Sequence, residues 1–464
     1  MPATNQFEDN LHLSILGLGV EYPPHRHGPE SLETLANRYY KSSTALTKVL
    51  SINRFTGIES RASIGQLDHP LVNQSTAPDI KQLDDFFRDE GVRLSVEASK
   101  KAIKDAGISV EEITHVVATT CTNSANPGFD HYVRKRLGIR NTENVLLHGI
   151  GCSGGLAAIR TAANLALGSS YRGRPARILV VACEISTPLF RSELDSVDRD
   201  QEVRIGVCLF SDGASACILS NGIGESVKGE PVYDILGWKH EIIDGTEEDL
   251  GFDVDPLGWK VVLTPRVPHL TCATVAPAFA DLVASIPSLS TTPNSSLIAE
   301  DFDWALHPGG STIITGIQRT MNLTEDHLRA SYEIYMNYGN SSSATIMSVL
   351  NRLRSYGAGR ENVVACAFGP GISQELMILK RRKWGVKDGQ GLNGHVEVNG
   401  HNQINGAREV NGHVATHEEA KSDGQAGDIV HAEPKGSGET DRHLESDANG
   451  VDGELSGLPV EDID

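Results

Sequence analysis

The 464-residue chain has no run of 18 or more apolar residues, which excludes the usual form of a membrane-spanning helix. Its first ten residues, MPATNQFEDN, lack both the apolar centre of a signal peptide and the arginines of a transit peptide. Positive charge is scarce, with 41 Lys and Arg against 61 Asp and Glu, so no broad basic face is available for nucleic acid. We therefore expect a cytoplasmic protein that neither spans a membrane nor binds nucleic acid.

Cysteine is also scarce, with seven residues in a chain of this length. Without a leader, this number favours reduced thiols over a disulfide framework. The sequence contains no CxxC or HExxH pair, and we therefore predict no zinc or other metal site.

Residues 385–464 have no Phe, Tyr, Trp, Cys or Met, and they hold 17 acidic but only 5 basic residues. This stretch therefore carries −12 of the formal net charge of −20. Asn-Gly recurs every six residues within it, at Asn393, Asn399, Asn405 and Asn411. Because so little apolar matter cannot form a core, we predict a disordered acidic tail. Its six histidines leave loose metal binding open as an alternative.

The rest of the chain alternates apolar runs with helical patterns, which predicts an α/β fold with a buried sheet. We expect strands over residues 13–18, 115–120, 145–147, 178–182, 214–219, 303–306, 362–368 and 375–380. We expect helices over residues 95–106, 128–137, 156–167, 312–321 and 343–356.

The sequence Val-Val-Ala-Cys occurs at residues 180–183 and again at 363–366, each time before a loop. Chance explains such a short echo equally well, but the order of elements is also repeated. We therefore predict two similar halves, residues 1–225 and 226–384, followed by the tail at 385–464. The irregular stretch 226–264, with its acidic run DGTEEDLGFD, predicts hairpins or a capping loop, or else a solvated surface excursion.

Cys152 lies in the glycine-rich stretch GIGCSGG, between an expected strand and an expected helix. At a helix N-terminus the macrodipole and unpaired N–H groups favour an anion. A nearby cationic or hydrogen-bonding partner would then lower the thiol pKa from about 8.5 to about 3.5–7.5, as in a nucleophile. A small buried cysteine in a structural turn fits the local sequence equally well. Of the other six, only Cys121, at a strand end, competes as nucleophile, because buried thiols are commonly inert.

Two further polar residues stand at similar places. His307 leaves an expected strand into the turn HPGG, and Asn340 follows a glycine in YGNSSS, whose serines could cap the next helix. The imidazole could accept a thiol proton, and the neutral amide could polarise a carbonyl. A core histidine and a turn asparagine are the alternatives for each alone. Cys, His and Asn in this order, 155 and then 33 residues apart, form a much stronger pattern.

With these residues the sequence resembles the type III polyketide synthases, the chalcone-synthase-like branch of the thiolase superfamily. The matching stretches are NPGFDHYVRKRLG, GIGCSGGLAAIRTAANLA, RILVVACEISTPLFR, LFSDGASACIL, ALHPGGSTII, MNYGNSSSATIMSVL and ACAFGPGISQELMIL. The resemblance covers about residues 10–383 and not the tail. Third-type ketoacyl-carrier-protein synthases share the Cys–His–Asn order but usually lack the FGPG loop. One departure is Ala367, where the family has a glycine before FGPG.

The resemblance implies a thiolase-like five-layer αβαβα fold of two pseudo-equivalent halves, and a homodimer. It implies that Cys152 takes an acyl group from a CoA thioester. His307 and Asn340 would form the oxyanion hole and stabilise the enolate left when malonyl-CoA loses CO₂. Repeated condensation would build a poly-β-keto chain that cyclises in the same cavity. The expected partners are thus acyl-CoA and malonyl-CoA, and no cofactor is required.

Local alignment with the family places Leu189, Tyr233, Val261 and Ser342 on the cavity wall, with Gly310 beside the histidine. Tyr233 and Val261 would correspond to two aromatic gatekeeper residues of the plant enzymes. Tyr233 would keep the aromatic side chain, and Val261 would open the other position with a small aliphatic one. An apolar channel suits a long alkyl starter, since each buried CH₂ stabilises by about 0.8 kcal/mol. The sequence looks most like fungal members that make alkylresorcylic acids, alkylresorcinols and alkylpyrones. An ordinary core valine at position 261 fits equally well.

Lys41 and Lys48 correspond to basic residues that would meet the CoA phosphates, although solvated surface lysines are the alternative. Asn126 stands where plant enzymes have a methionine that reaches across the dimer. Two other enzyme activities remain open, a single-round ketoacyl synthase and a chalcone-type synthase with an aromatic starter. A catalytically silent partner-binding protein acting through the acidic tail is a third alternative.

Overall fold

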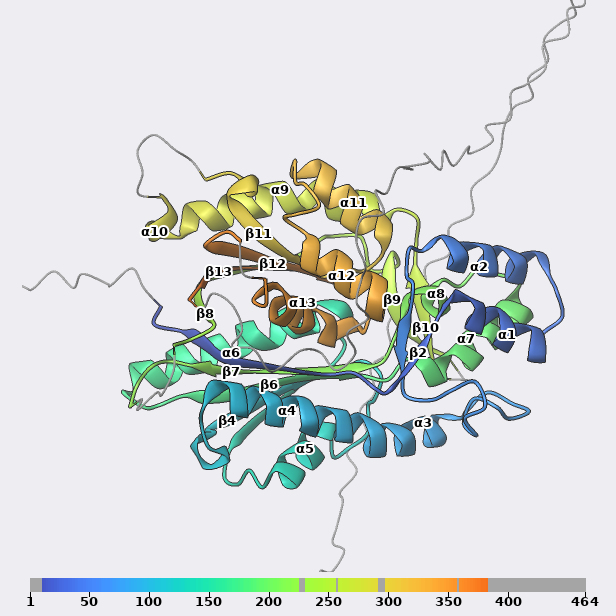
Figure 1. The fold of residues 1–464 in the computed structure, drawn as a ribbon, viewed down its shortest axis with the longest axis horizontal. Coiled ribbons are helices and arrows are strands. Elements are labelled where there is room, and N and C mark those ends of the chain that lie inside the picture. The colour runs from blue at the N-terminus through green and yellow to red at the C-terminus, as the bar shows by residue number, and fades with distance from the viewer. Residues whose placement is uncertain (1–10, 225–229, 256–257, 291–296, 357–358, 383–464) are drawn as a thin grey trace, which may run out of the picture. The chain divides into compact units, whose positions relative to one another are not determined.

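The computed structural model describes residues 11–224, 230–255, 258–290, 297–356 and 359–382, so the expected tail lies outside the described residues. Its main sheet has the strand order β11-β12-β13-β8-β1-β7-β6-β4-β5 (Figure 1). The strands are β1 (Ser14–Glu21), β4 (His115–Thr119), β5 (Glu143–Leu147), β6 (Arg177–Glu184), β7 (Gly213–Ser220), β8 (Tyr233–Ile242), β11 (Phe302–Leu306), β12 (Asn362–Gly369) and β13 (Ser373–Arg381). Every strand expected from the sequence is present, with ends displaced by a few residues.

The sheet consists of two corresponding halves that meet at β1 and β8. These strands pair only through Ser14 with Asp234 and Ile15 with Tyr233. On the outer side of β1, β7 is antiparallel to β1, β6 is antiparallel to β7, and β4 is parallel to β6. On the outer side of β8, β13 is antiparallel to β8, β12 is antiparallel to β13, and β11 is parallel to β12, which repeats the same pattern. The repeated Val-Val-Ala-Cys sequences therefore lie on corresponding strands, β6 and β12.

Helices complete a layered arrangement around these two half-sheets. Two inner helices share one apolar cluster with both halves, and the outer helices cover the far faces (Figure 1). The inner helices are α6 (Gly154–Tyr171) and α13 (Thr345–Leu353), and the outer ones are α4 (Val92–Ala106), α5 (Phe129–Leu137), α9 (Val267–Ser285) and α11 (Ser311–Thr320). The five-layer αβαβα fold of two pseudo-equivalent halves is thus confirmed.

Helix α9 contains Cys272 and is the only helix of the described residues long and apolar enough to cross a membrane. Its apolar character has a local explanation. Phe279 packs edge-on against Phe302 at a ring distance of 5.3 Å and lies 5.5 Å from the Trp304 ring. The helix therefore contributes side chains to the apolar cluster on the outer face of the C-terminal half-sheet.

A side lobe stands at one end of the layers and holds a separate apolar cluster (Figure 1). It consists of α1 (Pro29–Tyr39), α2 (Thr44–Phe55), α7 (Phe190–Asp200) and α8 (Gly206–Leu209), and the hairpin of β9 (Leu250–Asp255) and β10 (Gly258–Leu263) contacts α7. The remaining elements include β2 (His25–His27), β3 (Arg61–Ser63), α3 (Ile80–Phe86), α10 (Pro287–Ser290) and α12 (Arg329–Tyr338). Within residues 226–264 the expected hairpin is present. The surface excursion is wrong for β8, because its first three residues are buried in the main sheet.

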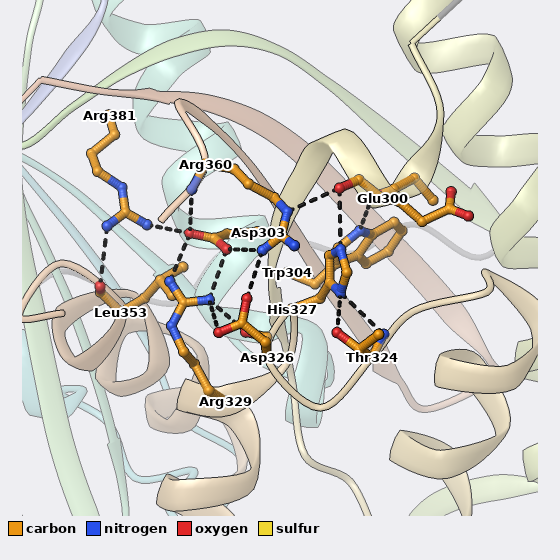
Figure 2. A network of polar contacts seen from close by, with 11 residues as sticks. Glu300, Asp303, Trp304, Thr324, Asp326, His327, Arg329, Leu353, Arg360 and Arg381 are labelled. Atoms are coloured by element: carbon orange, nitrogen blue, oxygen red, sulfur yellow. Dashed lines mark hydrogen bonds and ion pairs between the residues drawn. The ribbon is translucent and has the colours of Figure 1, made fainter. Parts of the chain in front are cut away.

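The carboxylate of Asp303 connects several segments of the C-terminal half (Figure 2). The fully buried Asp303, on β11, accepts hydrogen bonds from Arg329 at 2.8 Å, Arg360 at 3.1 Å and Arg381 at 2.6 Å. These arginines belong to α12, to the segment before β12 and to the end of β13. Asp303 therefore fixes the position of β11, the strand that leads directly into His307.

Candidate active site

Cys152 lies in a 3₁₀ turn, Gly151–Ser153, immediately before the inner helix α6. The corresponding inner helix, α13, follows a second 3₁₀ turn, Ser342–Ala344, and the two turns touch. As a result, the Cys152 Sγ is 3.5 Å from the Ser342 Oγ and 4.0 Å from the Asn340 Nδ2. The pseudo-symmetry of the fold thus brings Cys152 and Asn340 to one point although 188 residues separate them.

Two glycines permit this close approach. A Cβ on Gly155 would lie 2.4 Å from the Ser343 carbonyl oxygen, where α6 meets the segment before α13. A Cβ on Gly369, in the FGPG loop, would lie 2.3 Å from the Ile150 carbonyl oxygen. Because backbone atoms cannot move away as a flexible side chain can, both positions require glycine. The FGPG loop therefore packs directly on the turn that carries Cys152.

The side chain of Asn340 is oriented by its surroundings. Its Oδ1 accepts the Ser342 N–H at 2.8 Å and lies 3.4 Å from the Thr345 hydroxyl. The assigned amide orientation therefore turns the Nδ2 donor toward the Cys152 Sγ. Ser342 has a left-handed backbone, with φ of 45°, which is uncommon for a residue other than glycine and often marks a functional site.

His307 follows β11 and is held by its backbone N–H, which donates to the Cys366 carbonyl on β12 at 2.7 Å. Its side chain is buried, and neither ring nitrogen has a hydrogen-bond partner among the described residues. Burial lowers the pKa of the imidazole to about 3. A neutral ring with both nitrogens unused can accept a proton at one and donate at the other.

Burial also raises the pKa of the Cys152 thiol to about 11, with the hydrogen bond to Ser342 acting in the opposite direction. The negative charge of Glu184 raises it further, and the Asn340 amide lowers it. The lowered pKa expected from the helix N-terminus is therefore wrong for this structure, because burial outweighs that effect and His307 contributes no positive charge. Burial therefore favours the neutral form of both the thiol and the imidazole.

The Cys152 turn opens into a cavity with about 570 Å³ of empty space, a volume that includes open solvent. Three of the expected wall residues, Leu189, Val261 and Ser342, line it together with Cys152. Cys121 lines it too, with its Sγ 3.6 Å from the Ser342 Oγ. Apolar walls come mainly from the side lobe and the β9–β10 hairpin, namely Phe190, Phe210, Leu250 and Phe252.

The expectation for Tyr233 is wrong, because this residue does not line the cavity. It is fully buried on β8, its hydroxyl donates to the Leu350 carbonyl at 2.9 Å, and its ring belongs to the central core between the half-sheets. Phe210 supplies an aromatic wall instead, immediately before Ser211, whose N–H binds the Asn340 carbonyl at 2.9 Å. The apolar motif LFSDG was the available signal for Phe210.

The other expected binding residues lie away from this cavity. Gly310 is the buried residue that precedes α11. Lys41 and Lys48 are exposed, the first just before α2 and the second on it. Their contacts with CoA stay predictions. Asn126, the residue considered for a contact across a dimer, precedes Pro127 in a cis peptide bond.

Comparison with known proteins follows the same division into halves. The model of the N-terminal domain of chalcone and stilbene synthases matches residues 56–223, and that of the C-terminal domain matches residues 239–382. The type III polyketide synthase pspB of Penicillium soppii is 43% identical over 383 residues, covering 80% of this chain and 96% of that protein. The acylalkylpyrone synthase csyB of Aspergillus oryzae is 42% identical over 375 residues, covering 80% and 94%.

Solved structures give the same result. A fungal type III polyketide synthase, ORAS, is 57% identical with a TM-score of 0.78, and the match covers 80% of this chain and all of that one. CsyB complexed with CoA-SH is 41% identical, with the same TM-score and coverage. The chain therefore belongs to the chalcone and stilbene synthase family and is a type III polyketide synthase, an acyltransferase that condenses CoA thioesters with malonyl-CoA and needs no cofactor.

Proposed function

We propose that this enzyme loads a long-chain fatty acyl group on Cys152, extends it with malonyl-CoA and cyclises the product to an alkylpyrone, alkylresorcinol or alkylresorcylic acid. The observation that carries the proposal is the apolar wall of the cavity at Cys152. Each CH₂ of an alkyl starter buried there contributes about 0.8 kcal/mol. The relative at 42% identity is an acylalkylpyrone synthase, which also supports this choice.

Loading begins when the Cys152 Sγ attacks the thioester carbonyl carbon while its proton passes to His307. The Cys152 sulfur–acyl bond forms as the acyl–sulfur bond to CoA breaks, and CoA leaves as the thiol after it takes the proton back from His307. A base is needed because burial keeps the resting thiol protonated. The Asn340 Nδ2, turned toward the sulfur, stabilises the charge that develops on the carbonyl oxygen.

Extension uses the same donors. Malonyl-CoA loses CO₂, and the electrons of the broken C–C bond form an enolate whose oxygen accepts hydrogen bonds from His307 and Asn340. The enolate carbon attacks the acyl carbonyl on Cys152, a C–C bond forms and the thiolate leaves. A neutral histidine suits this step, since a neutral N–H can donate to the enolate without giving up its proton.

We also propose that the enzyme is a homodimer. Strand β5 is the outermost strand of the N-terminal half-sheet, and its Leu146 is 36% exposed. An open strand edge with an exposed apolar side chain favours pairing with a second chain. Light scattering of the purified protein measures the oligomeric state, and a monomer would contradict this proposal.

The deciding experiment is mass spectrometry of products formed from malonyl-CoA and acyl-CoAs ranging from acetyl to stearoyl, with coumaroyl included. Cyclised products with two or more malonyl units on long starters support the proposal. Turnover with coumaroyl-CoA alone would instead indicate a chalcone-type synthase, and one malonyl unit per product a single-round enzyme. Deletion of residues 385–464 should leave turnover intact.

Cys121→Ala is a matched control for Cys152→Ala, because both thiols lie within 3.6 Å of the Ser342 hydroxyl. We expect the Cys152 variant to form no acyl-enzyme and no product. The Cys121 variant should still become acylated. Product formation by Cys152→Ala would overturn the assignment of the nucleophile.

A further inference from the structure

A buried acid in the wall of the cavity is not used in the chemistry described above. Glu193, on α7, is 4% exposed and lines the same apolar cavity as Cys152 and Val261. Its Oε1 accepts the Val261 N–H at 2.7 Å, which fixes the carboxyl group against β10. Its Oε2 is buried and has no hydrogen-bond partner among the described residues.

Gly206 lines the cavity beside this oxygen and is packed closely there, since a Cβ placed on it would lie 2.7 Å from the Val261 Cγ2 and 3.4 Å from the Glu193 Oε2. A buried polar atom without a partner is costly, and such an atom in a binding cavity points to a ligand that supplies the partner. An alkyl chain cannot do so. The oxygen atoms of a poly-β-keto chain can.

Resting on the proposed function, we propose that the Glu193 carboxyl group donates a hydrogen bond from Oε2 to a keto oxygen of the growing chain. Glu193 is then a specificity-determining residue, which holds the extended chain in the cavity and sets the ratio of full-length to truncated products. The apolar walls bind the alkyl part of the same chain. This division fits a substrate with an alkyl end and an oxygen-rich end.

Only the protonated carboxyl can donate, so the charges around Glu193 matter. Burial raises its pKa to about 7, and the Val261 N–H lowers it. Arg204 and Lys260 lower it, and Asp255 raises it. On α8, the Cys208 thiol also interacts with it electrostatically and is neutral, because burial raises its own pKa to about 12.

The sign of the pH dependence follows. Below pH 7 the group is mostly protonated and the donor is present, whereas above pH 7 it is lost. Between pH 6 and pH 8 the protonated fraction falls from about 0.9 to about 0.1. We therefore expect the ratio of full-length to truncated products to fall up to about tenfold over this range in the wild type.

The test measures this product ratio by mass spectrometry, with one long-chain acyl-CoA and malonyl-CoA, from pH 6 to pH 8. A ratio of two products from one intermediate is insensitive to the loading rate. Glu193→Gln keeps the acceptor for the Val261 N–H and carries a permanent NH₂ donor. We expect it to show the high ratio at every pH. Glu193→Leu, which has no donor, should show the low ratio at every pH.

Glu59→Gln, an exposed position, is the matched control and should follow the wild-type profile. Thermal melting identifies any variant that fails to fold, and Glu193→Gln alone then decides the question. A wild-type pH profile in Glu193→Gln, or an equal ratio in the Gln and Leu variants, would overturn the inference while polyketides are still made. Absence of polyketides from every acyl-CoA with the wild type would instead refute the proposed function, and this inference with it.

Discussion

Removal of the Asn340 amide tests the central feature of the site. Its Nδ2 is 4.0 Å from the Cys152 Sγ, and its Oδ1 is held by the Ser342 N–H at 2.8 Å. The donor is therefore oriented before substrate binds and needs no rearrangement when charge develops. Loss of one such donor costs about 2.7–4 kcal/mol of transition-state stabilisation, or about 10²–10³ in rate. We expect this decrease in malonyl-CoA decarboxylation for Asn340→Ala.

Conversion of malonyl-CoA to acetyl-CoA without a starter isolates the decarboxylation step. Starter loading, measured as acylated Cys152 in a single turnover, should fall less, because His307 remains as base and donor. Asn340→Asp should decarboxylate more slowly still, since a carboxylate would repel the enolate. Asn337→Ala is a matched control, because its Nδ2 binds the Glu333 carbonyl at 2.9 Å. Decarboxylation by Asn340→Ala within tenfold of the wild-type rate would refute the reasoning.

Three further substitutions test other parts of the structure. Tyr233→Phe removes a buried hydrogen bond and should cost about 1 kcal/mol in urea unfolding without changing the product pattern. A changed product pattern would indicate that Tyr233 does line the cavity. Asp303→Asn should cost about 3–5 kcal/mol by the same measurement, whereas Asp326→Asn, at the exposed rim of the same network, should cost less than about 1 kcal/mol. Equal losses would contradict the buried-charge argument. Phe190 lines both the Cys152 cavity and a second cavity. Phe190→Ala should join the two and favour stearoyl-CoA over lauroyl-CoA when both starters compete. An unchanged preference would show that the two cavities do not join.

The local sequence pattern was sufficient to predict the buried strands of the main sheet. Strands such as β6 and β12 are covered on both faces, so they appear as continuous apolar runs. Glycine turns next to such runs pointed to Cys152, His307 and Asn340. The structure brings Cys152 and Asn340 together, and the catalytic roles of all three residues stay predictions. The pairing of the two halves could be anticipated from the repeated order of elements.

The cavity wall could not be predicted to the same depth. Tyr233 lies beside apolar residues whether it faces a cavity or a core, and only the packing of β8 against α13 distinguishes the two. Glu193 belongs to a helix rich in charged residues, where an acid normally faces solvent. Its burial arises from the β9–β10 hairpin covering α7, a contact between segments far apart in sequence. The prediction of a lowered pKa for the Cys152 thiol was wrong for a related reason, since the burial that raises this pKa depends on the whole fold and not on the local sequence.

The two groups of residues have different origins in the fold. Cys152 and Asn340 precede corresponding inner helices, α6 and α13, and His307 follows β11, so the proposed chemistry rests on the repeated core. Several of the remaining wall residues, among them Phe190, Gly206 and Phe252, lie in α7, α8 and the β9–β10 hairpin, which are inserted outside the main sheet. The core must keep its geometry for any decarboxylation to occur, and so must α8, because its Leu209 carbonyl accepts the Asn340 N–H at 3.0 Å. Substitutions of the inserted wall side chains on α7 and the hairpin leave this backbone contact in place. Substitutions in α7 or the hairpin should therefore alter starter choice and chain length while malonyl-CoA decarboxylation continues, and substitutions at the helix starts should do the reverse.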